Sequence, residues 1–342
     1  MGKYATVKAK QQGAALIVIM LVLAAMVSIA ATMSERLFVN FTRAENRLNH
    51  QQAYWYSLGV EALAEYAIEE SYSEGDTINL SQSWALKEQV FPLDYGEASG
   101  KIRDMQSCFN VNALSNIQQN SGTDAKPYLV TVFKTILDEL DVDSYQADVI
   151  ADSTWEYLDS DDNVTSSFGV EDSTYEALSP AYLAANGMLA DSSEMRSIYQ
   201  MDNKVMRAIE PIICAIPSDD WRLNVNTIEK KGATILAALF SPQLSVSKAE
   251  SIVDNRPFDG WSSVDDFLAE AEIASIDKVT KDKAKGYLST DSQFFELDAQ
   301  IIVNESRVRV RSLLFSTDRK DAAVVRRRFG GISERVSDRS TE

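Results

Sequence analysis

The sequence is poor in the residues on which many enzymes depend for catalysis and metal binding. Its 342 residues include two cysteines and one histidine, which leaves little material for a zinc site or a histidine-based catalytic group. His50 lies among polar neighbours in the stretch RLNHQQ, and we expect it on the exposed face of a helix. The composition therefore disfavours most hydrolase chemistries.

Positive charge is scarce as well. The chain has 33 lysines and arginines against 51 acidic residues, a net charge of −18. Because nucleic-acid binding depends on cations that neutralise phosphates, no nucleic-acid partner is expected. The length suffices for two domains, and a hydrophobic share of 45% is that of a globular protein rather than a polytopic membrane protein.

Charge is absent altogether from Ala14 to Ser34, and a helix of that length crosses the hydrocarbon core of a bilayer. Lys3, Lys8 and Lys10 precede this run. By the positive-inside rule they place the N-terminus in the cytoplasm and the body of the chain outside it. The segment therefore predicts a single-pass membrane anchor.

A secretory signal peptide is the alternative for this segment. Ile29, Ala30 and Ala31 offer a small-residue cut site, so that alternative stays open. Against it, the apolar run is long for a signal core, and the helical pattern continues without a break to Trp55. Moreover, Gly13 stands at the start of the apolar run, where signal peptidase does not cut.

A basic leader that ends in glycine, followed by an apolar helix that continues as an amphipathic one, resembles the class III signal of type IV pilins and type II secretion pseudopilins. The resemblance implies that a prepilin peptidase cuts between Gly13 and Ala14 and that the new N-terminus is methylated. Most members have glutamate at the fifth mature position, where this chain has Val18. In the family that glutamate meets the N-terminal amine of the preceding subunit, because a carboxylate inside a membrane needs a partner. Val18 therefore points to a first, topmost subunit.

The rest of the chain predicts a long helix, a helical middle and strands at the end. Residues 48–71 carry an apolar stripe, residues 74–100 form a polar loop in this interpretation, and a first strand ends at Asn110. Helices are expected at 126–140, 144–158, 192–200 and 203–213. Three antiparallel strands are expected at 294–303, 306–316 and 322–329.

Two short stretches of the sequence echo each other. CFNVNAL at 108–114 and RLNVNTI at 222–228 share an apolar-Asn-Val-Asn pattern, and because asparagine is a favoured N-cap, we expect Asn112 and Asn226 to cap the helices that follow. Residues 233–271 resemble a helix-hairpin-helix unit. Its DNA-binding form needs a glycine-rich hairpin, whereas this hairpin reads SPQLSVSKA, so we interpret the unit as a structural helical pair.

Together these features resemble one family, the K-type minor pseudopilins of type II secretion systems. The residues that carry the resemblance are Gly13–Ile17 with Val18 in place of glutamate, the helix from Asn46 to Ala62, Cys108–Asn112, Leu158–Asp162, Gly169–Asp172 before Tyr175, and Pro211–Pro217 with the second echo.

The resemblance implies an α+β, pilin-like fold, in which a long N-terminal transmembrane helix packs on an antiparallel sheet, with a large inserted all-helical domain. The expected parts are a cleaved leader (1–13), a transmembrane helix (14–34), a first pilin-like part (35–108), the inserted domain (109–216), a second pilin-like part that includes the helix-hairpin-helix-like segment (217–331) and a disordered tail (332–342).

The resemblance also implies a non-enzymatic role in the cell inner membrane, with the body in the periplasm. The subunit would cap the pseudopilus tip, initiate assembly with the I-type and J-type minor pseudopilins and support export of folded proteins across the outer membrane. The inner-membrane assembly platform and the prepilin peptidase are further expected partners. Two alternatives stay open: an anchored periplasmic hydrolase that uses the acidic residues between Asp141 and Asp172, and an anchored calcium-binding scaffold without a filament role.

Carboxylates crowd into the segment that follows residue 158. Calcium prefers hard oxygen ligands, and the D-x-D-D opening resembles the start of an EF-hand loop, although the glycine and the closing glutamate have the wrong spacing. Because the K-type family binds calcium in its helical domain, the resemblance implies a structural calcium site. Its expected ligands are Asp159, Asp161, Glu171 and Asp172, with Asp162 and Asn163 as further candidates. A solvated acidic loop is the alternative.

Both cysteines lie in the part expected outside the cytoplasm, where disulfides form. Cys108 and Cys214 each precede one of the echoed Asn-Val-Asn turns. We predict a disulfide between them that ties both ends of the helical insertion to the sheet. Two buried free thiols are the alternative.

Overall fold

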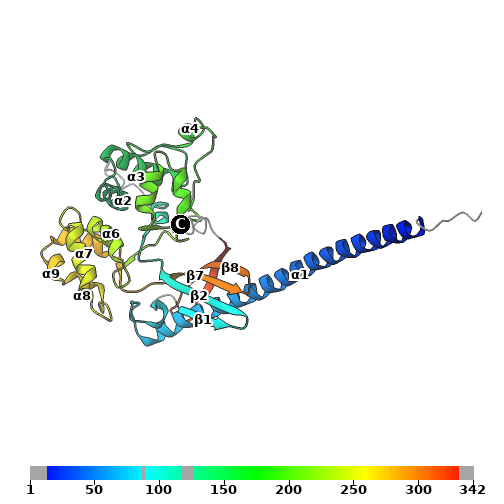
Figure 1. Ribbon diagram of the computed structural model, residues 1–342. Coiled ribbons are helices and arrows are strands. Elements are labelled where there is room, and N and C mark those ends of the chain that lie inside the picture. Colours follow the sequence, from blue (N-terminus) through cyan, green and yellow to red (C-terminus); the bar gives the residue numbers. More distant parts are fainter. Residues whose placement is uncertain (1–13, 87–88, 118–125, 331–342) are drawn as a thin grey trace, which may run out of the picture.

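The computed structural model describes residues 14–86, 89–117 and 126–330 (Figure 1). It begins with α1 (Ala14–Glu74), a continuous helix of 61 residues. Residues 14–48 of α1 are exposed, and this helix is long and apolar enough to cross a membrane. The chain therefore has one candidate membrane span in the described part, and that span continues directly into the folded body.

An antiparallel sheet packs against the second half of α1. Its strand order is β1-β2-β7-β8-β9, with β1 (Gln89–Leu93), β2 (Gly96–Asp104), β7 (Phe294–Val303), β8 (Ser306–Phe315) and β9 (Ala323–Phe329). The three expected C-terminal strands are confirmed. Apolar side chains of α1 and the sheet form one core, which includes Ala53, Ile68, Phe295, Ile301 and Val310.

The expected loop at 74–100 is wrong, because this segment contains the 3-10 helix η1 (Ser83–Ala85), β1 and the first half of β2. The strand pattern is hidden because the buried residues of β2 are Ala98 and the polar Asp104. Gly96 is required at the turn, since a Cβ there would lie 1.8 Å from the Ile302 carbonyl oxygen. The hairpin therefore forms through its pairing with β7 rather than through its own apolar content.

The helical part of the chain lies beside the sheet, away from the free end of α1 (Figure 1). The insertion at 109–216 follows β2 and starts with β3 (Phe109–Asn110) and the 3-10 helix η2 (Val111–Leu114). It continues with α2 (Tyr128–Glu139), α3 (Ser144–Leu158), α4 (Asp172–Tyr175), η3 (Ser192–Ser197), α5 (Asn203–Ile209) and β4 (Ile213–Cys214). The expected helices at 126–140 and 144–158 are confirmed, and the one at 203–213 is confirmed as far as Ile209, because Ile213 belongs to β4. The helix expected at 192–200 is a 3-10 helix.

A second set of helices follows before the chain returns to the sheet. It comprises β5 (Leu223–Asn224), η4 (Lys230–Gly232), α6 (Ala233–Leu239), α7 (Val246–Asp254), α8 (Val264–Leu268), α9 (Ala271–Ala274), α10 (Lys278–Lys285) and β6 (Leu288–Ser289). These helices share one core with the insertion. For example, the Tyr128 hydroxyl of α2 donates to the Leu239 carbonyl of α6 at 2.5 Å.

The echoed asparagines act differently from the expectation that the second of each pair is an N-cap. Asn110 and Asn224 instead accept from the backbone N–H groups of Asn112 at 3.2 Å and Asn226 at 2.9 Å. The side chains of Asn112 and Asn226 are fully buried and bind distant backbone, at Leu189 and Trp261 respectively. A buried amide must satisfy both its donor and its acceptor, so the second asparagine joins segments instead of capping a helix.

Polar contacts and a disulfide hold the junction between the sheet and the helical part. Cys108 and Cys214 are bonded, which confirms the predicted disulfide. The fully buried Asp104 at the end of β2 accepts hydrogen bonds from Asn224, Thr227 and Ser292. Burial raises the pKa of Asp104, and these hydrogen bonds lower it in part. The chain segments that connect the sheet with the helical part therefore meet around the buried side chain of Asp104.

Candidate metal site

Acidic side chains from α3 and the following loop converge on one point in the insertion. Glu156 lies in the last turn of α3, Asp159 follows its end, and Glu171 directly precedes α4. Each offers a carboxylate oxygen, and these oxygens all lie within 4.8 Å of one another. We call these three residues the acidic cluster.

Glu171 is the member of the cluster with the least compensation from the protein. Its side chain is 3% exposed, and both carboxylate oxygens are buried without a hydrogen-bond partner. Burial, followed by the negative charges of Asp159 and Glu156, raises the pKa of Glu171 to about 8. A buried carboxylate with no donor is costly in its charged form, so the site is built for a positive partner.

Asp159 shares this environment. Burial, opposed by a backbone hydrogen bond from Asp161, raises the pKa of Asp159 to about 6, and the charge of Glu156 adds to the rise. Its backbone N–H donates to the Trp155 carbonyl at 3.1 Å and so completes the end of α3. The helix end therefore fixes where Asp159 stands relative to Glu156.

Glu156 was not predicted as a ligand from the sequence. The loop at 159–172 folds over this member of the cluster. It is fully buried and accepts from the backbone N–H groups of Thr165 at 3.0 Å and Ser166 at 2.6 Å. Gly169 permits this close approach, since a Cβ there would lie 2.6 Å from Glu156 Cγ. The available signal was the helical spacing from Asp152 through Glu156 to Asp159, which puts three acids on one face of α3.

The other predicted ligands lie around the acidic cluster, not within it. Asp161 is exposed and accepts two bonds from Asn163, both at 2.8 Å, and the backbone bond, followed by the side-chain one, lowers the pKa of Asp161. Asp162 accepts from the Asn186 side chain at 2.6 Å, and Asp172 accepts from the Ala184 backbone at 2.8 Å. The structure thus unites two predicted ligands, Asp159 and Glu171, with the unpredicted Glu156.

The chemistry of the donor set fits a calcium ion. All three donors are carboxylate oxygens, which suit calcium, magnesium or manganese and not softer metals. Calcium–oxygen distances of about 2.3–2.6 Å put opposite ligands roughly 5 Å apart, which matches the spread of the cluster oxygens. The side-chain carbonyl oxygen of Asn186 is also buried without a partner, and an amide carbonyl is a further calcium ligand type.

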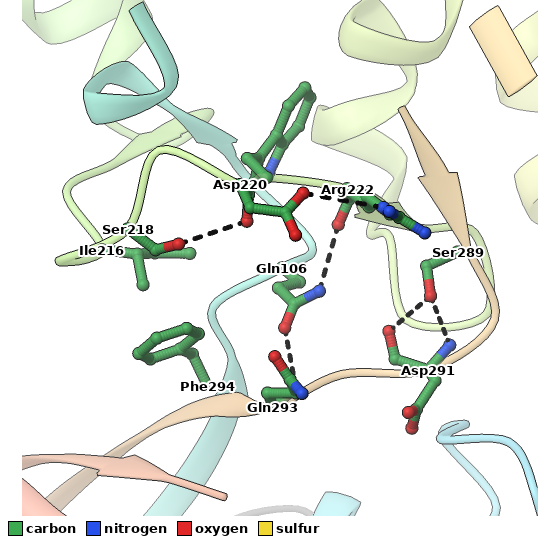
Figure 2. Close-up of a pocket in the computed structure, with 10 residues that line it drawn as sticks. Gln106, Ile216, Ser218, Asp220, Arg222, Ser289, Asp291, Gln293 and Phe294 are labelled. Carbon is green, nitrogen blue, oxygen red and sulfur yellow. Dashed lines mark hydrogen bonds and ion pairs between the residues drawn. The ribbon is translucent and has the colours of Figure 1, made fainter. Parts of the chain in front are cut away.

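A separate pocket of 260 Å³ lies at the junction of the sheet and the helical part (Figure 2). Its wall includes Gln106, which donates to the Arg222 carbonyl at 3.2 Å and accepts from the Gln293 backbone at 2.7 Å. Ser289 accepts from the Asp291 backbone at 2.9 Å. These polar groups bind one another and join the segments that connect the sheet with the helical part. The pocket therefore belongs to this junction and is separate from the acidic cluster.

Comparison with known proteins identifies the family. Family models described as Type II secretion system (T2SS), protein K match residues 107–218 and 223–291. Type II secretion system protein K of Pectobacterium carotovorum subsp. carotovorum is 36% identical over 95% of this chain and 98% of its own length. The homologous protein of Aeromonas hydrophila is 34% identical, with the same coverage of both chains.

A solved structure gives the same result for the fold. A chain of the GspK-GspI-GspJ complex from the type 2 secretion system of enterotoxigenic Escherichia coli has a TM-score of 0.78 and 36% sequence identity. The match covers 84% of this chain and 99% of that one. The long apolar helix, the antiparallel sheet, the helical insertion and these relatives together show that the chain belongs to the type II secretion system protein K family.

Proposed function

We propose that this chain is the minor pseudopilin that caps the tip of a type II secretion pseudopilus, initiates its assembly and so supports export of folded proteins. The observation that carries the proposal is the place of the helical part, which stands at the end of the molecule away from the free apolar end of α1 (Figure 1). Pilin-like subunits stack along their N-terminal helices. A bulky helical part beyond the sheet leaves no room for a further subunit above it.

Two features support the tip position and the partners. Val18 lies on the exposed membrane segment of α1 and carries no carboxylate that needs the amine of a preceding subunit. The neighbouring structure is that of a GspK-GspI-GspJ complex, so we propose the I-type and J-type minor pseudopilins as partners. The role requires no catalysis, and the fold with its family favours it over the anchored hydrolase and the filament-free scaffold.

We further propose the topology and processing of the chain. A prepilin peptidase would cut between Gly13 and Ala14, and the assembly platform of the inner membrane would receive the mature subunit. Gly13 lies outside the described residues, whereas Ala14 is the first residue of α1. The lysines before residue 13 favour a cytoplasmic N-terminus and a periplasmic body.

The tip position is tested by labelling. Gold particles directed at an epitope on this chain should mark one end of each pseudopilus in electron micrographs. The same label on the major pseudopilin, as a control, should mark the filament along its length. Labelling of this chain at many points along a filament would contradict the cap.

We also propose that the acidic cluster binds a structural calcium ion through Glu156, Asp159 and Glu171. The support is the pair of unpartnered, buried oxygens of Glu171 and the raised pKa of Glu171 and Asp159. When bound, the ion would supply positive charge that compensates the three carboxylates. It would hold the loop at 159–172 against α3 and so order the insertion.

The calcium site is tested by thermal unfolding of the full-length protein in detergent. A ligand that binds only the folded state stabilises it by about 2.7 kcal/mol at one hundred times its Kd, so calcium should raise the melting temperature relative to a chelator. Glu171→Gln should lose this response. Glu176→Gln, a matched change at an exposed acid directly after α4, should keep it. If the wild type has the same melting temperature in calcium and in chelator, the proposed calcium site is wrong.

A further inference from the structure

The edge strand β9 carries three consecutive arginines that bind different parts of the molecule. Successive side chains of a strand point to opposite faces of the sheet. Arg327 pairs with Glu61 of α1 at 2.5 Å, whereas Arg326 and Arg328 both donate to the carbonyl oxygen of Ala190 in the insertion. The strand therefore contacts the long helix with one face and the insertion with the other.

The contact with the insertion is charge-assisted. Arg328 Nη2 donates to the Ala190 carbonyl at 2.9 Å, and Arg328 also pairs with the carboxylate of Asp191. Burial raises the pKa of Asp191, but hydrogen bonds from Ser193 and the charge of Arg328 outweigh it and lower the pKa overall. Asp191 is thus held in its charged form, and charge-assisted bonds of this kind are stronger than neutral ones.

The segment at 184–191 leads from the surroundings of the acidic cluster to this contact. At one end, the backbone of Ala184 donates to Asp172, and the side chain of Asn186 donates to Asp162 at 2.6 Å. In the middle, Leu189 exchanges bonds of 2.8 and 2.9 Å with the side chain of Asn112. At the other end, Ala190 and Asp191 meet the arginines. The segment is therefore fixed along its length by polar contacts.

Both acids at the first end belong to the loop that the cluster organises. Asp162 lies three residues after Asp159, and Asp172 directly follows Glu171. A cation that draws Asp159 and Glu171 toward Glu156 also fixes Asp162 and Asp172. These two residues in turn fix where the segment at 184–191 begins, and hence where its far end meets β9.

We propose that Arg326 and Arg328 couple calcium binding in the insertion to the edge of the sheet, and so set the orientation of the helical part on the pilin-like part. The two arginines are positioning residues that act through Ala190 and Asp191. This inference rests on the proposed calcium site. Coupling is reciprocal, so a contact with β9 that calcium tightens must itself strengthen calcium binding.

The first test measures calcium affinity by titration calorimetry on the full-length protein in detergent. Coupling of this kind typically changes an affinity by about five-fold or more, so the double variant Arg326→Gln/Arg328→Gln should bind calcium at least about five-fold more weakly. Arg327→Gln is the matched control on the same strand, because its side chain contacts α1 and not the insertion, and it should bind like the wild type. A merely structural role would lower the melting temperature of the double variant and leave its Kd unchanged.

The second test needs no variant. Hydrogen exchange of the wild type should slow on calcium addition at amides of both 184–191 and 323–329. If calcium stabilises the wild type while β9 exchange and the Kd of the double variant stay unchanged, the coupling is wrong and the calcium site stands. If the wild type neither binds calcium nor gains stability from it, both the calcium site and its coupling to β9 are wrong. Should the double variant fail to fold, the exchange of β9 in the wild type decides.

Discussion

Single residues in this protein place a buried carboxyl group where the surrounding chain gives it no hydrogen-bond donor. Glu171 has two buried oxygens without a donor, and burial together with its acidic neighbours raises its pKa to about 8. Carboxylates must lose their protons before they bind a metal ion. Protons and the proposed calcium ion would therefore compete for the acidic cluster in the range around neutral pH.

We predict that calcium binds more tightly at pH 8 than at pH 6, by roughly ten-fold or more. The folded pKa of Glu171 lies above its ordinary value of 4.5, so between these values the calcium-free folded state binds more protons than the unfolded state. Its stability in the absence of calcium therefore falls as the pH rises through that range, while calcium affinity rises. Calorimetric titration at the two pH values measures this change. Equal affinities at both would contradict it.

Close packing also requires a glycine at position 260. Gly260 has a φ of +71°, and a Cβ there would lie 2.5 Å from the side chain of Asn226, which binds the backbone of Trp261. We predict that Gly260→Ala lowers the free energy of unfolding by about 1–3 kcal/mol.

The matched control is Gly59→Ala in the middle of α1. A Cβ at Gly59 meets nothing within 4 Å, and alanine in a helix interior stabilises by roughly 0.5–1 kcal/mol relative to glycine. Denaturant unfolding of both variants measures the two effects. Equal stabilities of the two variants would show that the contact between Gly260 and Asn226 is not required.

Among the elements, the short strands β3 and β4 determine how the insertion joins the sheet. They pair in parallel, with Phe109 opposite Ile213 and Asn110 opposite Cys214. Phe109 also stacks on Phe133 of α2, with ring centroids 5.3 Å apart. The start and the end of the insertion therefore lie side by side, and the disulfide joins them covalently.

We predict that the double variant Cys108→Ser/Cys214→Ser is less stable by up to about 4.7 kcal/mol, the chain-entropy value for a loop of about 100 residues. The disulfide separates its cysteines by 106 positions, so it restricts a large part of the unfolded chain. Denaturant unfolding with and without a reductant measures the loss. The wild type should match the variant once reduced, and an unfolding midpoint that does not respond to the reductant would contradict the prediction.

At the scale of the whole molecule, α1 runs from an exposed apolar segment into the folded body without interruption. Its first part is apolar and exposed, and its second part forms the core with the sheet. Glu61 of the second part is buried and binds Arg327 of β9. The exposed apolar segment and the part of α1 that packs on the sheet therefore belong to one continuous helix.

We predict that the mature membrane form starts at Ala14 and has lost Lys3, Lys8 and Lys10. Intact-mass measurement should find the chain without residues 1–13 and with one additional methyl group. Gly13→Val should retain the leader, since the peptidase requires the small residue. A full-length wild-type mass, or a cut near Ala30, would contradict assignment of the class III signal.

Much of the architecture follows from local sequence patterns. The charge-free run before Ser34 defines the membrane helix, and apolar periodicity predicts α2, α3 and α5. Alternation predicts the strands β7, β8 and β9. The disulfide was predictable because the sequence has two cysteines, which allow one pairing within the chain, and both lie in the part expected outside the cytoplasm. Of the acidic cluster, Asp159 and Glu171 were predicted from the loop composition and the family resemblance.

Contacts between distant residues decided the rest. Glu156 resembles any acid on an amphipathic helix until the loop at 159–172 folds over it, and the β1–β2 hairpin depends on pairing with β7. Asn112 and Asn226 carry N-cap chemistry in the sequence, yet burial makes them bind backbone far along the chain. The sequence by itself determined the anchor and the main elements, because their signals lie within a few turns or residues. The tertiary structure alone decided which acids meet and how β9 holds the insertion, because those arrangements depend on which segments pack together.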